Sequence, residues 1–303
     1  MIQFIIIILI ILIIFLIIPK VYEYYDNIKL DIGNQISAYF FHLGLAILQK
    51  KNFVNNEKNS HKNNFFFQSL PSHIKYEFDD IYNCLSSKGI KYENFSSIWD
   101  IAAWEIEEND RYYFWKCMKP LIHKILNETF KKCGLEKKIK YPIIHFRCAD
   151  TPFNYHPSYH FQYYSFFTNA LDKLNKKYDK ILLMSCSFHK SNENRIKSCN
   201  IYTNSLQDYL KKNKYDSEII CNSNIDDFAT LFYAPAIIST GSSFSFMSGF
   251  FGNGIYISTE LKSDGSYNCN SCNDIILQGY NLLHENVIDY HDTAKVINLL
   301  KND

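Results

Sequence analysis

The stretch that decides the fold is YPIIHFRCADTPFNYHPSYHFQYY, residues 141–164. It opens with an apolar run at residues 142–144, which is typical of a short buried strand. Where that strand should end, the chain places His145, Arg147 and Asp150. Ligand groups gather at the carboxyl ends of strands in open α/β sheets, so these three side chains form a candidate site. The alternative is a surface salt bridge between Arg147 and Asp150.

The segments that follow alternate between strand and helix patterns. Apolar runs bounded by turn residues predict strands, and apolar residues at helical spacing predict the helices between them. We expect strands at residues 180–185, 217–221, 236–239 and 255–257, and helices at residues 159–177, 205–212, 226–233, 243–251 and 293–301. This alternation predicts an α/β domain whose parallel sheet carries helices on both faces.

A second strand-to-helix turn lies in the N-terminal half of the chain. A short strand predicted at residues 28–30 runs into DIGNQ, residues 31–35, and a helical pattern begins at Ile36. Such a corner can bind an anion or a sugar, although Gly33 and Asn34 also suit an ordinary turn and helix cap. Farther along, we expect a loop at residues 50–64, a strand at 65–67, helices at 76–85 and 105–133, and a domain boundary after the basic connector at 137–140.

The N-terminal residues contain a continuous apolar run at residues 4–18, mainly isoleucine. This is about the shortest helix that crosses a bilayer, and no small-residue cleavage site follows it. We therefore expect an uncleaved single-pass anchor at residues 1–20, with a buried core helix as the alternative. The charges that flank the run do not decide its orientation. Two sequons, at Asn94 and Asn127, would be glycosylation acceptors in a lumenal domain.

The composition excludes some classes of function. The net charge is +1, so no basic field favours nucleic acid as a partner. The nine cysteines are scattered and odd in number, which in a chain of this length indicates reduced thiols rather than a disulfide framework. Cys269 and Cys272 form a lone CxxC, which fits half a zinc site, a small disulfide loop or neither. The chain has no GxGxxG, P-loop or GxSxG motif and no Asp-x-Asp for a manganese ion, so we expect no metal site.

A second predicted strand end carries small polar residues. The strand expected before residue 240 runs into TGSSF, residues 240–244, at the start of the next helix. Hydroxyls and exposed helix amides can hold phosphate oxygens, although Ser242 and Ser243 also suit plain helix capping. Asp227 heads the preceding predicted helix. Because parallel strand ends share one edge of a sheet, we expect Arg147 and Ser242 to face one ligand.

Three motifs occur in a fixed order along the chain. They are GNQ at residues 33–35, HFRCAD at 145–150, and DDF at 226–228 followed by STGSSFS at 239–245. Together they resemble the G-x-G-N-Q, H-x-R-x-x-D and D-D-F…S-x-S-S-F motifs of the fucosyltransferase superfamily of GT-B type. This superfamily contains the α1,2-, α1,6- and protein O-fucosyltransferases, and the resemblance is closest to the α1,2 enzymes of family 11 and the protein O-fucosyltransferases.

The resemblance covers the chain from Ile28 to its end and implies a fold with two Rossmann-like domains. Residues 21–140 would form the N-terminal, acceptor-side domain, and residues 141–303 would form the C-terminal domain that binds the nucleotide sugar. A transmembrane helix at residues 1–20 would precede them.

The family pattern also implies roles for residues at the donor phosphates. Arg147 would bind the β-phosphate of GDP-fucose and stabilise the leaving diphosphate by charge-assisted hydrogen bonds. His145 would lie at the same site, while Ser242, Ser243 and the amide of Phe244 would hold phosphate oxygens.

Other residues have implied roles around this phosphate site. Asp227 would contact the guanine or the ribose, and Gly33 and Asn34 would line the cleft from the N-terminal domain. Asp31 stands where the family has glycine, and its carboxylate would accept the proton of the acceptor hydroxyl as a general base. Asp150 would orient Arg147 or His145.

The resemblance therefore implies an inverting, metal-independent glycosyltransferase that needs no cofactor besides its donor substrate, GDP-fucose. It would transfer fucose to a hydroxyl of a glycan or glycoprotein, as a type II membrane protein of a Golgi- or ER-like compartment. One alternative is a transferase that uses another nucleotide sugar on the same scaffold. Another is a non-catalytic, membrane-anchored carbohydrate-binding protein, because Cys148 stands where many members have a second arginine.

Overall fold

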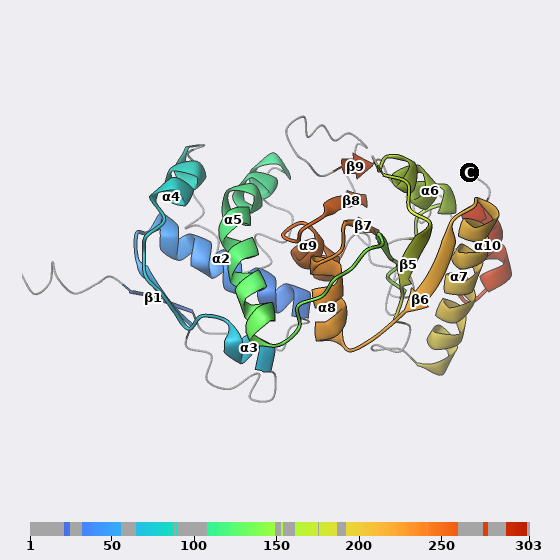
Figure 1. Cartoon of the computed structure of the whole chain (residues 1–303), viewed down its shortest axis with the longest axis horizontal. Coiled ribbons are helices and arrows are strands. Elements are labelled where there is room, and N and C mark those ends of the chain that lie inside the picture. Colours follow the sequence, from blue (N-terminus) through green and yellow to red (C-terminus); the bar gives the residue numbers. More distant parts are fainter. Residues whose placement is uncertain are drawn as a thin grey trace, which may run out of the picture. The chain divides into compact units, whose positions relative to one another are not determined.

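The chain folds into two compact units, Met1–Cys133 and Gly134–Asp303 (Figure 1). The division falls a few residues before the boundary expected at 140/141, and each unit is described by itself. Gly134, with a φ of +68°, ends the last helix of the first unit in the left-handed conformation that favours glycine. The computed structural model describes residues 21–24, 32–55, 65–87, 89, 108–148, 153, 161–174, 176–186, 192–240, 242–259, 275–277 and 289–301.

The second unit contains a six-stranded sheet in which every neighbouring pair is parallel. Its strands are β4 (Ile143–His145), β5 (Lys180–Met184), β6 (Asp216–Ile220), β7 (Ala236–Ser239), β8 (Ile255–Thr259) and β9 (Ile275–Leu277). They lie in the order β6-β5-β4-β7-β8-β9. Numbered within the sheet this is 3-2-1-4-5-6, the order of a doubly wound Rossmann-like sheet. The predicted α/β class with a parallel sheet is confirmed.

Alternate residues of the central strands face opposite helical layers. Ile144, Ile238 and Ile257 belong to one core cluster with the helices on their side of the sheet. On the other side, a Cβ added at Gly249, the last residue of the helix α9 (Ser243–Gly249), would meet Ile237 and Tyr256 within 3 Å. This helix therefore lies directly on the sheet. The first layer contains α6 (Tyr164–Asp172), α7 (Glu193–Lys212) and α10 (Thr293–Lys301); α9 packs on the second face and contacts α8 (Asn224–Phe232).

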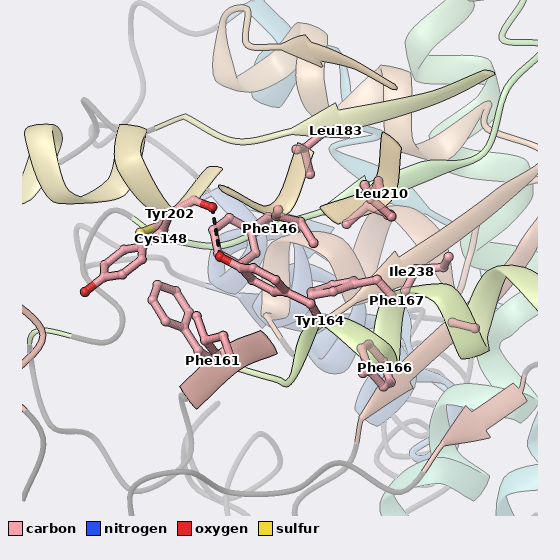
Figure 2. Packing of buried hydrophobic residues seen from close by; sticks show 14 of the residues in the cluster. Phe146, Cys148, Phe161, Tyr164, Phe166, Phe167, Leu183, Tyr202, Leu210 and Ile238 are labelled. Atoms are coloured by element: carbon pink, nitrogen blue, oxygen red, sulfur yellow. Dashed lines mark hydrogen bonds between the residues drawn. The ribbon is translucent and has the colours of Figure 1, made fainter. Parts of the chain in front are cut away.

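Aromatic side chains fill the core beneath the first layer, as Figure 2 shows. Phe146 and Phe161 stack with their ring centroids 5.1 Å apart. The buried hydroxyl of Tyr164 donates to the carbonyl of Tyr202 at 3.2 Å, and that of Tyr202 donates to the carbonyl of Tyr290 at 2.5 Å. The buried hydroxyls of Tyr164 and Tyr202 therefore both have acceptors, as buried polar groups require.

The first unit is a smaller α/β assembly. Its three-stranded sheet has the order β1-β2-β3, with β1 and β2 parallel and β2 and β3 antiparallel. A Cβ added at Gly44 would meet the ring of Phe114 at 2.5 Å, so this glycine permits the close contact of the two long helices. The elements are β1 (Val21–Tyr24), α2 (Ile32–Leu48), β2 (Asn52–Asn55), α3 (Phe65–Ser69), β3 (His73–Ile74), α4 (Asp79–Ser86) and α5 (Glu108–Lys132).

Several sequence predictions for the first unit need correction. The apolar run at residues 65–67 is helical rather than extended, and the segment expected to be a loop at 50–64 contains the strand β2. Gly33 lies inside the first turn of α2 and has no positive φ, so it is not the turn residue that was expected. Long helices were expected in both places and are found there as α2 and α5, although α2 begins at Ile32, before the predicted start at Ile36. The strand expected at residues 28–30 lies outside the described residues.

No helix among the described residues has both the length and the apolar character needed to span a bilayer. The anchor predicted at residues 1–20 lies outside those residues. The sequon at Asn127 lies within α5, where the Thr129 side chain is 2 % exposed and donates to the carbonyl of Ile125. The folded helix therefore does not present this sequon on a surface loop, where acceptor sites are expected.

Candidate functional site

The site lies at the point where the strand order of the second unit reverses. β4 and β7 are neighbours, and His145 pairs with Ser239 at their carboxyl ends. Arg147 follows β4 by two residues, and Ser242 begins the segment after β7 that becomes α9. In doubly wound sheets the two chain crossovers leave this point in opposite directions, which opens a crevice for a ligand. We call His145, Arg147, Ser242, Ser243 and Phe244 the switch-point site.

His145 is held as a neutral imidazole. Burial, reinforced by the nearby positive charge of Arg147, lowers the pKa of His145 from 6.5 to about 3. Its Nδ1 is buried and has no hydrogen-bond partner among the described residues. The ring lies against Phe244, with the centroids 5.8 Å apart and the planes tilted by 32°. A neutral imidazole with an unused nitrogen can bind a polar ligand atom without adding a second positive charge.

Ser242 caps the helix that follows β7. It has extended backbone angles, φ −169° and ψ 137°, and its Oγ accepts a hydrogen bond from the amide of Phe244 at 3.2 Å. This is the ordinary geometry of a helix N-cap. The amide of Phe244 is therefore occupied in this structure, and a phosphate oxygen would have to replace the Ser242 hydroxyl as its acceptor.

A buried pair of serines supports this capping turn. The Oγ of Ser239 lies 2.6 Å from that of Ser245, and the Ser245 hydroxyl also donates to the carbonyl of Ser242 at 3.2 Å. Both Ser239 and Ser245 are 0 % exposed, so they serve the fold and not a ligand. The half-buried Ser242 and Ser243 carry the hydroxyls at the accessible start of α9.

The start of α8 forms the neighbouring part of the same edge of the sheet. Ser223 is its N-cap, accepting from the amide of Asp226 at 3.2 Å, and its hydroxyl donates to Asp226 Oδ2 at 2.7 Å. Lys137, in the connector before β4, lies 3.0 Å from Asp226 Oδ1. The hydrogen bond from Ser223, followed by that from Lys137, lowers the pKa of Asp226.

Asp227 is turned inward and is only 3 % exposed. Its carboxylate accepts hydrogen bonds from the backbone amide of Asn222, at 3.2 and 3.1 Å to its two oxygens, and from Nδ2 of Asn222 at 3.0 Å. Cys186 and Cys221 form a disulfide that joins the ends of β5 and β6. The Sγ of Cys186 lies 3.2 Å from Asp227 Oδ2. We call Cys186, Cys221, Asn222 and Asp227 the disulfide corner.

The disulfide corner is also the one group of side chains, among the described residues, whose donor atoms lie close enough together to hold a metal ion. The sulfur atoms of Cys186 and Cys221 and a carboxylate oxygen of Asp227 lie within 4.8 Å of one another. Metal binding by cysteine requires thiolates, whereas the two sulfur atoms are joined to each other in this structure. The arrangement is therefore that of a covalent link beside a buried carboxylate.

The cysteines correct a sequence prediction. They were expected to be reduced thiols, but three pairs are joined: Cys84–Cys117, Cys148–Cys199 and Cys186–Cys221. The partners of each pair are far apart in sequence, yet their Cα atoms lie 5.3 to 5.7 Å apart because neighbouring elements meet there. Cys133 is free.

The structure brings part of the predicted site together. The residues of the switch-point site follow β4 and β7 and belong to the same edge of one sheet. Asp227 lies at the same edge, beside the ends of β5 and β6. Gly33 is buried and Asn34 half-buried in α2 of the other unit. Asp31 and Asp150 lie outside the described residues.

Sequence reasoning missed Asn222 and the link between Cys186 and Cys221. A signal was present, because each of these cysteines stands at the end of a predicted strand. Two cysteines at the carboxyl ends of successive parallel strands lie at the same edge of the sheet, within reach of each other if the strands are neighbours.

No protein-family model, no curated protein and no solved structure matches this chain.

Proposed function

We propose that this protein is an inverting, metal-independent fucosyltransferase of GT-B type that uses GDP-fucose and a hydroxyl of a glycan or glycoprotein. The observation that carries the proposal is the position of Arg147 and Ser242. Both follow the carboxyl ends of the paired strands at which the order of a doubly wound sheet reverses. This is the place where such sheets bind nucleotides, and an arginine with serine hydroxyls suits a diphosphate.

In the proposed reaction, the acceptor hydroxyl attacks the anomeric carbon of fucose from the face opposite the diphosphate. The new bond joins the acceptor oxygen to that carbon, and the bond from the carbon to the β-phosphate oxygen breaks. The hydroxyl proton passes to a carboxylate, for which Asp31 is the candidate, and GDP leaves with the bonding electron pair. Negative charge develops on the departing phosphate, so Arg147 stabilises the transition state more than the ground state.

The neutral state of His145 fits this division of roles. Because its pKa lies near 3, the imidazole stays uncharged at physiological pH. It can donate one hydrogen bond to a phosphate or sugar oxygen, and the positive charge at the diphosphate then comes from Arg147. Asp150 would orient one of these two side chains, while Gly33 and Asn34 would contribute from the acceptor-side domain.

The disulfides support a lumenal position for this activity. Such bonds form and persist in oxidising compartments and are rare in the cytosol. Three of them in the described residues, after an apolar run at residues 4–18, fit a type II protein that is anchored by residues 1–20 in an endomembrane.

The test is a calorimetric titration of the full-length chain in mild detergent with GDP, GDP-fucose, GDP-mannose and UDP-glucose, in the presence of a chelator. We expect GDP and GDP-fucose to bind selectively. Arg147→Ala should weaken GDP by at least about 100-fold and abolish transfer, because a charge-assisted bidentate contact is lost. Arg195→Ala is the matched control. Arg195 lies on α7, with its guanidinium 5.5 Å from the ring of Phe153, and its loss should change neither result.

Each other outcome has a definite meaning. Preferred binding of GDP-mannose or UDP-glucose would replace the fucose donor by another nucleotide sugar. Binding of none of the four by a folded chain, or unchanged GDP binding in Arg147→Ala, would overturn the proposed function. If a folded chain binds none of the four nucleotides, the non-catalytic carbohydrate-binding protein becomes the better explanation.

A further inference from the structure

The disulfide corner holds an exposed amide in a fixed orientation. Asn222 is exposed and follows Cys221 directly, yet both its backbone amide and its side-chain Nδ2 donate to the buried carboxylate of Asp227. A carboxylate oxygen without a proton can only accept hydrogen bonds, so the nitrogen of the Asn222 side chain is the atom that faces Asp227. The side-chain oxygen therefore points the other way.

This oxygen is an available acceptor. No donor among the described residues is bonded to Oδ1 of Asn222, and the residue is exposed. An exposed asparagine normally samples several side-chain rotamers, but two contacts to one buried carboxylate restrict this one. The edge of the sheet thus carries a preoriented acceptor beside the ends of β5 and β6.

The start of α8 does not require this contact. Ser223 already caps the helix, and Asp226 already bonds to the Ser223 hydroxyl and to Lys137. These are the groups that satisfy a helix N-terminus in ordinary proteins. The contact between Asp227 and Asn222 is therefore additional to the capping of α8.

The distance of this corner from the switch-point site suits a nucleotide. β6 is separated from β4 by one strand, β5, so their carboxyl ends lie roughly 10 Å apart at the usual strand spacing. That separation is comparable with the distance between the base and the terminal phosphate of an extended nucleoside diphosphate. The Cys186–Cys221 disulfide fixes the two strand ends between which the base would lie.

We propose that Asn222 reads the base of the donor nucleotide through its side-chain oxygen, and that Asp227 is the positioning residue that orients it; this rests on the proposed function. An acceptor oxygen at this place selects a base edge that presents donors. Guanine offers two adjacent donors, its N1–H and its exocyclic N2 amine, that can share this oxygen, whereas adenine offers only its N6 amine beside an unprotonated N1 that repels the oxygen. Asp227 then acts behind Asn222 and does not touch the base.

The experiment compares GDP, ADP and pyrophosphate binding to the full-length chain in mild detergent. Asn222→Ala should weaken GDP about tenfold and lower the GDP:ADP affinity ratio by the same factor, the effect of one lost hydrogen bond to a well-placed acceptor. Its affinity for pyrophosphate should not change. Asp227→Asn should also lower the GDP:ADP ratio. The new side-chain amide at position 227 can donate to the Asn222 oxygen, so the Asn222 side chain can rotate and present its nitrogen, a donor, to the base. Asn222→Ser, which shortens the side chain, serves as a second variant.

The matched control is Ser223→Ala, which removes the cap of the same helix. We expect it to lower the Tm and leave the GDP:ADP ratio unchanged, as a purely structural role requires. If Asn222→Ala and Asn222→Ser keep the wild-type ratio while GDP binding still depends on Arg147, the inference is overturned and the proposed function stands. If a folded wild-type chain does not bind GDP, both fail.

Discussion

The switch-point site and the disulfide corner lie at the same edge of one sheet but are stabilised in different ways. The switch-point site is held by hydrogen bonds that a ligand can exchange: the Ser242 cap is engaged with the Phe244 amide, and Nδ1 of His145 lacks a partner among the described residues. The disulfide corner is fixed by a covalent bond and by the Asn222 side-chain nitrogen, which donates to the buried Asp227. Under the proposed function, the position of the base would be set before binding, whereas the position of the phosphates would be completed by the ligand.

The largest expected effect is the loss of stability on removal of a disulfide, and it allows the Cys186–Cys221 bond to be compared with a disulfide that has no proposed ligand role. Replacing Cys186 and Cys221 together by serine should lower the free energy of unfolding by about 2–4 kcal/mol, and so should the same change at Cys84 and Cys117. Only the double replacement at Cys186 and Cys221 should also lower the affinity for GDP, because it releases the strand ends beside Asp227. Urea unfolding and GDP titration measure the two quantities.

Equal loss of GDP affinity in both double variants would show that the corner has no special part in binding. The comparison of the two regions would then reduce to a difference in stability alone.

The next effect concerns the pH dependence of stability, to which the switch-point site contributes through His145. Burial lowers the pKa of His145 to about 3 and that of His42, in the other unit, to about 4. Below pH 6.5 the unfolded chain binds protons that the folded chain does not, so each histidine removes about 1.4 kcal/mol of stability per pH unit. The loss should extend from about pH 6.5 toward each folded pKa.

Thermal unfolding at pH 7.5, 6 and 5 tests this expectation, with His42→Gln as the control that removes the contribution of the first unit. A Tm that stays constant over this range in the wild-type chain would show that the buried neutral state of His145 is wrong.

The smallest effect compares two serine caps. Ser242→Ala and Ser223→Ala should each cost about 1 kcal/mol, because each removes the acceptor of one helix amide. Only Ser242→Ala should also weaken pyrophosphate, by up to about tenfold, since its hydroxyl lies at the switch point. If the two variants weaken pyrophosphate equally, Ser242 is a plain cap.

The sequence predicted the second unit well because its signals are local. The strands β4, β5, β7 and β8 contain short apolar runs, whereas β6 has only Ile219 and Ile220 at its end; the helices α6 and α8 carry apolar residues at helical spacing. The shared sheet edge of the segments that carry Arg147 and Ser242 followed from parallel topology alone. α7 begins well before its predicted start, at Glu193, because its first turn is polar and the buried face of its N-terminal half mixes Ser198 and Thr203 with Cys199 and Tyr202.

The failures have physical causes. The triplet at residues 65–67 could not be assigned, because a run of three phenylalanines has no period and fits either element. The disulfides were missed because pairing depends on which strands are neighbours, and sequence does not give connectivity. The role of Asn222 was invisible for a similar reason: its partner Asp227 reads as an ordinary first-turn carboxylate until burial shows that it faces inward.

The position of β4 in the sheet also bears on how the chain is made. β4 is the first strand of its sheet to be synthesised and lies at the centre, but its partner β7 follows only after α6, β5, α7, β6 and α8. The pairing of His145 with Ser239 must therefore wait until most of the unit has emerged from the ribosome. A chain interrupted before residue 239 would have the arginine but no second strand to face it. The switch-point site thus forms late, although β8, β9 and α10 have still to be added after it. Binding of the proposed donor would therefore report that β4 and β7 have paired.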